Sequence, residues 1–185
     1  VERKGMKIAF LGFSRVWPSG SWAATSKKAG LAGTYSSTLP LKAIAKAREE
    51  ADLVIVIAHW GEERNPRPVQ HQTDLAHAYI DAGADLVVAS HPHVVQGFEQ
   101  YKDKWIAYSM GNFIFTTNEV PETWESMILE ASCTKERLCE LTMVPILTKF
   151  AQPIRMIEEE GHKLFAKLVS HSPNARIDAK GVITA

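Results

Sequence analysis

The chain has 185 residues, of which 45% are hydrophobic and 23% charged, a composition typical of a globular protein with one core. Lysine and arginine number 21, and so do aspartate and glutamate. The formal net charge is therefore zero, which disfavours a non-specific nucleic-acid binder. No apolar run reaches the ~18 residues of a membrane-spanning helix, and no basic segment followed by an apolar one marks a secretion signal.

Three apolar runs in the first half of the chain predict buried strands, at residues 7–13, 52–58 and 84–90. The last two are continuously apolar, as in a parallel sheet that is covered on both faces. Between them, residues 69–82 have the apolar face of a helix that ends at Gly83. Strand, helix and strand therefore form a βαβ unit.

The segment between the first two strands divides into a loop and a helix. Residues 14–39 are rich in Ser, Gly, Ala and Thr without a sustained period, which predicts a long surface loop. An apolar face then predicts a helix that extends to Glu50, with Thr38 as its N-cap.

After Pro92 the pattern favours mainly antiparallel strands. Residues 94–101 and 104–109 alternate around a polar turn, which predicts a hairpin. Further strands are expected at 112–116, 124–133 and 138–147. Pro153 is expected to break the chain before a helix over residues 158–169. The whole sequence therefore predicts one α/β layer structure.

Cys133 and Cys139 flank a predicted hairpin turn, close enough to form a disulfide if the register of the two strands is right. Two half-buried free thiols are an equally good interpretation. The spacing matches no zinc-binding motif, and the redox compartment stays open.

Three histidines stand where buried strands end. His59 follows the strand at 52–58 directly, and His91 and His93 follow the strand at 84–90. In an open α/β sheet, ligands bind outside the carboxyl ends of the strands, so we expect the three imidazoles at one edge. Pro92 favours an extended His91, which would point His91 and His93 the same way, roughly 6–7 Å apart. The three rings are therefore candidate ligands for one metal ion or two closely spaced ions.

The loop after His59 carries further candidates. Glu62 is a candidate general base or substrate contact. Arg64 and Arg67 are suited to clamp an anionic group. A solvated, charged loop explains the arginines and Glu63 equally well.

Two of these interpretations have a structural alternative. A lone histidine at a strand end, such as His59, is more often capped by backbone groups than functional, although the three histidines together favour a site. Asn112 follows an apolar strand and is either a site residue or, as its type favours, a turn residue.

Three motifs in this sequence resemble those of a known family. They are His59-Trp-Gly-Glu62, the segment 82–97 around His91-Pro-His93, and the segment 108–115. They are similar to the poly-γ-glutamate capsule biosynthesis proteins of the CapA (PgsA) family, a branch of the calcineurin-like metallophosphoesterase superfamily. The resemblance covers roughly residues 4–155.

The resemblance implies a metallophosphoesterase-like α/β/β/α sandwich with a binuclear site for Mn, Fe or Zn between its sheets. On that pattern His59, His91 and His93 are metal ligands, and Glu62 and Asn112 match less specific catalytic positions. The resemblance also implies metal-dependent hydrolysis or amide-bond chemistry on a phosphate or amide substrate. It places the protein on the extracellular face of the bacterial membrane, with other capsule synthesis proteins as partners.

The superfamily's earlier motifs, which supply an aspartate, a bridging carboxylate and an Asn-His pair, have no counterpart here. Residues 1–155 are thus expected to be the C-terminal portion of such a domain, and residues 156–185 its last helix and tail. We expect an inactive half-site with weak or absent metal binding, and exposed apolar surface that favours a homodimer. The alternative is a non-enzymatic anchoring component that binds the anionic polymer poly-γ-glutamate through Trp60, Arg64 and Arg67.

Overall fold

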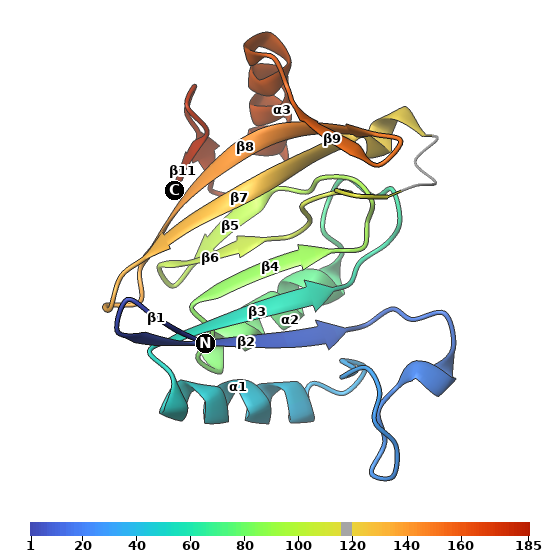
Figure 1. Cartoon of the computed structure of the whole chain (residues 1–185), viewed down its shortest axis with the longest axis vertical. Helices are drawn as coiled ribbons and strands as arrows, with labels where there is room; N and C mark the ends of the chain where they lie inside the picture. The colour runs from blue at the N-terminus through green and yellow to red at the C-terminus, as the bar shows by residue number, and fades with distance from the viewer. Residues whose placement is uncertain (116–119) are drawn as a thin grey trace.

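The computed structural model describes residues 1–115 and 120–185, and this part of the chain forms a mixed α/β fold with two sheets and three α-helices (Figure 1). The helices are α1 (Thr38–Glu50), α2 (Gln70–Asp81) and α3 (Glu158–His171), with short 3-10 helices η1 (Gly20–Trp22) and η2 (Pro121–Thr123). The strands of the first sheet are β1 (Glu2–Arg3), β2 (Met6–Ser14), β3 (Leu53–His59), β4 (Leu86–Ser90), β5 (Phe98–Tyr101) and β6 (Lys104–Ala107). The strands of the second sheet are β7 (Glu125–Cys133), β8 (Cys139–Lys149), β9 (Gln152–Arg155), β10 (Arg176–Ile177) and β11 (Val182–Thr184).

The first sheet has the order β1-β2-β3-β4-β6-β5. Strands β2, β3, β4 and β6 run parallel, and β1 and β5 pair antiparallel at the two edges. Helix α2 connects β3 to β4, so the predicted βαβ unit is confirmed. The hairpin of β5 and β6 is confirmed as well, although β6 joins the sheet by parallel pairing with β4.

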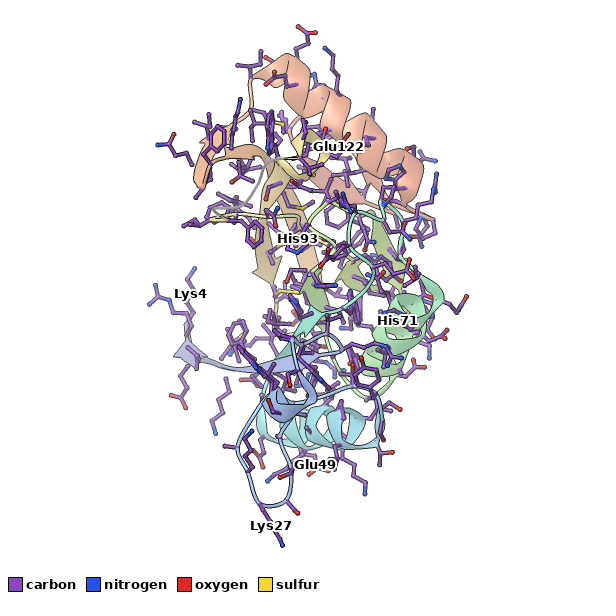
Figure 2. The ribbon with its side chains drawn as sticks, turned by 90° about the vertical axis from the view of Figure 1, so that its right-hand side faces the viewer. Lys4, Lys27, Glu49, His71, His93 and Glu122 are labelled. Atoms are coloured by element: carbon purple, nitrogen blue, oxygen red, sulfur yellow. A yellow bond between two sulfur atoms is a disulfide. The ribbon has the colours of Figure 1, made fainter. Side chains whose placement is uncertain are left out.

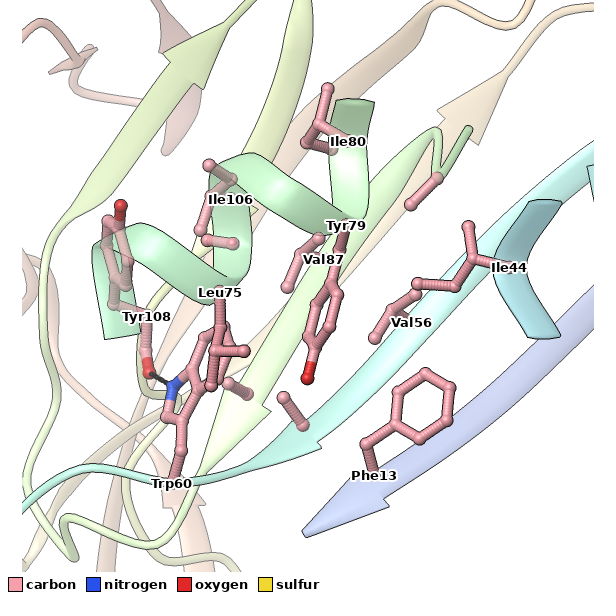
Figure 3. Packing of buried hydrophobic residues seen from close by; sticks show 14 of the residues in the cluster. Phe13, Ile44, Val56, Trp60, Leu75, Tyr79, Ile80, Val87, Ile106 and Tyr108 are labelled. Carbon is pink, nitrogen blue, oxygen red and sulfur yellow. Dashed lines mark hydrogen bonds between the residues drawn. The ribbon is translucent and has the colours of Figure 1, made fainter. Parts of the chain in front are cut away.

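The apolar run of β3 is buried because α1 and α2 cover one face of the first sheet. Val54 and Val56 of β3 are fully buried there together with Ile44 of α1 and Tyr79 of α2 (Figure 3). Ile55 points to the opposite face, as alternation along a strand requires. The apolar run of β3 is therefore covered on both faces only in its first half, because Ile57, which shares the face of Ile55, is exposed.

The second sheet has the order β10-β11-β8-β7, with β9 also paired to β8, and all its pairs are antiparallel. It encloses a second core with helix α3 and with the β4, β6 and β5 part of the first sheet. Members of this core include Phe98, Trp105, Leu141, Met143, Leu164 and Leu168. Two sheets with helices packed against them are compatible with part of a metallophosphoesterase-like fold.

The face of the first sheet opposite α1 and α2 is left uncovered at β2 and β3. Phe10 and Ile57 are 54% and 45% exposed. They share that face, because Ile57 pairs with Gly12, two residues after Phe10. Ile128 of β7 is 41% exposed. The expected exposed apolar surface is therefore present at these positions.

Three local predictions differ from the structure. Residues 112–115 form no strand, and residue 116 lies outside the described residues. Pro153 lies within β9, opposite Thr148, instead of breaking the chain. β9 tolerates proline because it is a short strand at the border of its sheet. Ser37, not Thr38, is the N-cap of α1.

The two cysteines are paired. Cys133 and Cys139 face each other at the end of the β7–β8 hairpin and form a disulfide across a Cα–Cα distance of 4.0 Å. This resolves the choice between a disulfide and free thiols. Among the described residues, no helix is long and apolar enough to cross a lipid bilayer.

A buried carboxylate joins the starts of the central strands. Asp85 precedes β4 and is 2% exposed. Its Oδ2 accepts hydrogen bonds from Nη1 of Arg48 at 2.6 Å and from the backbone N–H of Val54 at 2.9 Å. Its Oδ1 lies 3.3 Å from Nζ of Lys104. One side chain thus links α1, β3, β4 and β6.

We expect Asp85→Asn to lower the free energy of unfolding by about 3 kcal/mol, because Arg48 and Lys104 lose their shared counter-charge in a buried place. Urea denaturation followed by circular dichroism measures the loss. Asp81→Asn is the matched control, since Asp81 pairs with Lys102 at the surface. Equal effects of the two substitutions would contradict the structural role of Asp85.

Reduction of the disulfide is expected to lower the free energy of unfolding by about 2 kcal/mol, the loop-closure contribution of a short loop. Thermal unfolding with and without dithiothreitol checks this. The double variant Cys133→Ser, Cys139→Ser should have the stability of the reduced protein, and dithiothreitol should not change it. A response of that variant to dithiothreitol would refute the pairing as the cause.

Candidate metal centre

The register of two parallel strands brings the first two histidines together. His59 is the last residue of β3 and pairs with Ser90, the last residue of β4. His91 follows directly, and the ring centroids of His59 and His91 lie 4.7 Å apart. The expectation that strand-end histidines gather at one edge of the sheet is therefore confirmed for this pair.

His93 reaches the same place through a tight turn and not through an extended segment. The φ angles of His91 and His93 are +106° and +62°, so the prediction of an extended His91 is wrong. The loop after β3 is tied to this turn, because the backbone N–H of Arg64 donates to the carbonyl oxygen of Pro92 at 2.7 Å. The ring centroids of His91 and His93 lie 5.9 Å apart.

Asn112 orients the third imidazole. Its Oδ1 accepts a hydrogen bond from Nδ1 of His93 at 2.8 Å, and its Nδ2 donates to the carbonyl oxygen of Thr123 at 3.3 Å. Because an amide oxygen can only accept, the proton is on Nδ1, and Nε2 of a neutral His93 keeps a free lone pair. Figure 2 shows His93 at mid-height of the molecule, between the parts that hold α1 and α3. Asn112 is thus a positioning residue for His93.

The surroundings favour neutral rings. The pKa of His91 is lowered to about 4, first by burial and then by the neighbouring His59 and His93. Partial loss of solvent lowers the pKa of His59, with a smaller contribution from His93. A neutral imidazole is the form that binds a metal ion.

The three rings fit part of a metal site and not a whole one. Within residues 1–115 and 120–185, no three His, Cys, Asp or Glu side chains are arranged to hold a metal ion. Neighbouring imidazoles, one of them fixed by Asn112, nevertheless have the chemistry that a metal site requires. No carboxylate of the described residues joins the three histidines as a further ligand.

The two glutamates after His59 act on different histidines. Glu62 is exposed, and its Oε2 accepts a hydrogen bond from Nδ2 of Asn65 at 3.3 Å. Its charge acts on His71, while the charge of Glu63 acts on His91, where it opposes the lowering of the pKa. No pattern in the sequence distinguishes these adjacent residues, so the electrostatic role of Glu63 was missed.

Trp60 is a core residue, so the prediction that it contacts a ligand is wrong. Its side chain is 1% exposed and stacks on Tyr79 with ring centroids 6.1 Å apart. Its Nε1 donates to the carbonyl oxygen of Tyr108 at 3.1 Å (Figure 3). Trp60 therefore anchors the start of the loop after β3 in the core of the protein.

The structure separates the two arginines. Arg64 is exposed and sits beside the His91–His93 turn, with its own φ at +59°. Arg67 is also exposed, but it lines a different pocket together with His171. Arg64 does not line that pocket, and the clamp of an anionic group by the two arginines stays a prediction.

Comparison with known proteins gives a consistent result. A family model described as Bacterial capsule synthesis protein PGA_cap matches residues 1–117. The capsule biosynthesis protein CapA of Bacillus anthracis is 37% identical over 153 residues, which are 80% of this chain and 36% of that relative. The PGA biosynthesis protein CapA of Bacillus subtilis (strain 168) is 35% identical over 149 residues, 80% of this chain and 38% of the relative.

A third relative, the uncharacterized protein y4sH of Sinorhizobium fredii, is 34% identical over 87 residues, 44% of this chain and 18% of that protein. The chain spans less than two fifths of the length of the two CapA proteins. The residues matched by the family model include the whole histidine turn and Asn112. The chain therefore belongs to the CapA family of bacterial capsule synthesis proteins, PGA_cap.

Proposed function

We propose that the whole protein acts in the synthesis of a bacterial poly-γ-glutamate capsule, and that His59, His91 and His93 are ligands of a divalent-metal centre in it. The observation that carries the metal proposal is the neighbouring pair His59 and His91 at the carboxyl ends of β3 and β4, with His93 beside His91 in the turn that follows. Membership of a family of capsule synthesis proteins supports the biological role.

The residues of this chain would have different roles at such a centre. A bound Mn, Fe or Zn ion would activate water or polarise a carbonyl or phosphoryl oxygen. His59 and His91, with lowered pKa values, stay neutral and ready to bind metal at neutral pH. Asn112 keeps the Nε2 of His93 free. Glu62, exposed in the same loop, is a candidate proton acceptor or substrate contact.

The remaining ligands would come from parts of the whole protein outside this chain. Three imidazoles do not neutralise two divalent ions, which generally require carboxylate ligands as well. The curated CapA relatives are more than twice as long as the segment that matches here. The uncovered face that carries Phe10 and Ile57 offers apolar surface for such a part, or for a second copy of this chain.

The proposed location is the extracellular face of the bacterial membrane. Disulfides persist in oxidising compartments and are rare in the cytosol. The Cys133–Cys139 pair agrees with that environment. The proposed partners are the anionic polymer or a phosphate or amide substrate, together with other capsule synthesis proteins.

A second candidate function is a non-enzymatic polymer-binding or anchoring component. One observation favours it: Arg64, exposed, is held beside the histidine turn by the hydrogen bond from its backbone N–H to Pro92. A guanidinium in that position suits a glutamate carboxylate of the polymer.

In the full-length protein, His91→Ala and His59→Ala should each lower the bound metal and abolish polymer synthesis. The two variants complement each other, because alanine is strained at the positive φ of His91 but not in strand β3. Metal analysis of the purified proteins and capsule assays in cells measure both effects. His162→Ala is the matched control, since that imidazole lies on α3 outside the histidine group, where it hydrogen-bonds the carbonyl oxygen of Ala179 and lies near the ring of Phe165.

Full metal content and polymer yield in both histidine variants would refute the metal proposal. Arg64→Ala separates the two candidate functions. Loss of polymer affinity, with histidine variants that still support synthesis, would favour the anchoring component. Loss of turnover with the metal retained would favour the enzyme.

In this chain without metal, the imidazole protons of His91 should titrate with a midpoint near pH 4 instead of the ordinary value of about 6.5. The unfolded chain therefore binds this proton at higher pH than the folded one. The contribution to stability is fully present above pH ~6.5 and falls as the pH drops toward 4. NMR titration of the histidine ring signals checks this, and a midpoint at the ordinary value would contradict the described burial.

A further inference from the structure

A pocket of about 340 Å³ lies away from the histidine group, between the loop before α2, strand β5 and the end of α3. Its volume is at the small end of the range for ligand sites. The residues that matter for its chemistry are Arg67, Thr73, Glu99, Tyr108, His171 and Ser172. None of them belongs to the candidate metal centre.

The backbone of the pocket wall that carries Arg67 is held by the buried side-chain amide of Gln96. Gln96 is fully buried, and its Nε2 donates to the carbonyl oxygens of Asn65 at 2.9 Å and Arg67 at 3.0 Å. Its Oε1 accepts a hydrogen bond from Nε2 of Gln72 at 2.8 Å. The backbone that presents the guanidinium is therefore preformed.

The opposite wall is fixed as well. Oγ of Ser172 accepts from the backbone N–H of Phe98 at 2.9 Å and donates to the carbonyl oxygen of Leu168 at 2.7 Å. A Cβ at Gly97 would lie 2.6 Å from the carbonyl oxygen of His171, so β5 and α3 meet here without room for a side chain. The pocket thus lies between two rigid elements.

Arg67 is a cation without an anionic partner. In the part of the chain that the structure describes, no carboxylate forms an ion pair with it. Glu99 lines the same pocket, but both of its oxygens are engaged. One accepts from the hydroxyl of Tyr108 at 2.5 Å, and the other lies 2.8 Å from Nε2 of His77.

His171 lies on the other side of the pocket. Burial lowers the pKa of His171, the positive charges of Arg67 and Lys167 lower it further, and the charge of Glu125, which pairs with Lys167, opposes this. Nδ1 of His171 is buried and has no hydrogen-bond partner among the described residues. Ser172 caps the carbonyl oxygens of Leu168 and Val169, which reduces the negative potential at this end of α3.

We infer that this pocket binds one carboxylate group, with the guanidinium of Arg67 as its ion-pair partner. A planar guanidinium matches a carboxylate through two parallel hydrogen bonds. One guanidinium balances a carboxylate, whereas a doubly charged phosphate beside Glu99 would lack compensation. The carboxylate can belong to a free small acid or to a unit of poly-γ-glutamate, and only the second source rests on the proposed function.

The test is calorimetric titration of the 185-residue chain with glutarate, with neutral glutaramide as the ligand control and poly-γ-glutamate in a separate titration. Arg67→Ala should weaken glutarate binding at least tenfold. Arg176→Ala is the matched control, since it removes an exposed arginine outside the pocket and should leave the affinity unchanged. The NMR signals of the His171 ring should shift on addition of glutarate.

Saturable glutarate binding that is lost in Arg67→Ala supports the pocket, and binding of the polymer with the same dependence identifies the polymer as a source. Absent glutarate binding, or equal affinity in Arg67→Ala, overturns the inference. Polymer binding that does not depend on Arg67 overturns the polymer as the source of the carboxylate, and it leaves the proposed capsule function standing. Inorganic phosphate that competes on equal terms with glutarate would overturn the assignment to a carboxylate.

Discussion

The shared carboxylate of Asp85 is the constraint on which the geometry of the sheet depends. It holds the end of α1 and the first residues of β3, β4 and β6 in one cluster of hydrogen bonds and ion pairs. Parallel strands that are aligned at their amino ends are aligned at their carboxyl ends too. His59 therefore stands beside Ser90 and His91, although 31 residues separate Val54 from Asp85 along the chain. The ion-pair cluster at the amino ends of the strands thus sets the position of the histidines at their carboxyl ends.

The loop at the carboxyl end of β3 is held in place by buried side chains. Trp60 fills the space under the loop after β3, and Gly61 at φ +94° lets the backbone pass where a Cβ would lie 2.8 Å from Gln72. Gln72 in turn bonds Gln96, which fixes the backbone of Asn65 and Arg67. The same supported loop thus carries Arg64 beside the histidine turn and Arg67 in the pocket.

The sequence allowed the parallel strands, the βαβ unit and the meeting of His59 with His91 to be predicted, because these depend on runs of apolar residues and on the common direction of neighbouring strands. It did not allow the conformation of single residues to be predicted. The preference of a residue before proline failed at His91, which has a positive φ in a turn that is hydrogen-bonded to the loop after β3 through Arg64 and Pro92. Residue type was equally misleading for Trp60, which suits a ligand groove or a core and is placed by its packing against Tyr79. Asn112 and Glu63 act through contacts across the fold, which local sequence does not encode.

The disulfide at the end of the β7–β8 hairpin closes a five-residue loop that contains Lys135 and Arg137, both exposed at the surface. Such residues are the cleavage points of trypsin-like proteases. A cut in this loop would leave the two strands joined through Cys133 and Cys139 and paired from there to Glu125 and Leu147. The nicked chain would keep both its cores and would come apart into two fragments only when reduced and unfolded. The hairpin would thus keep its structure after cleavage in this exposed loop.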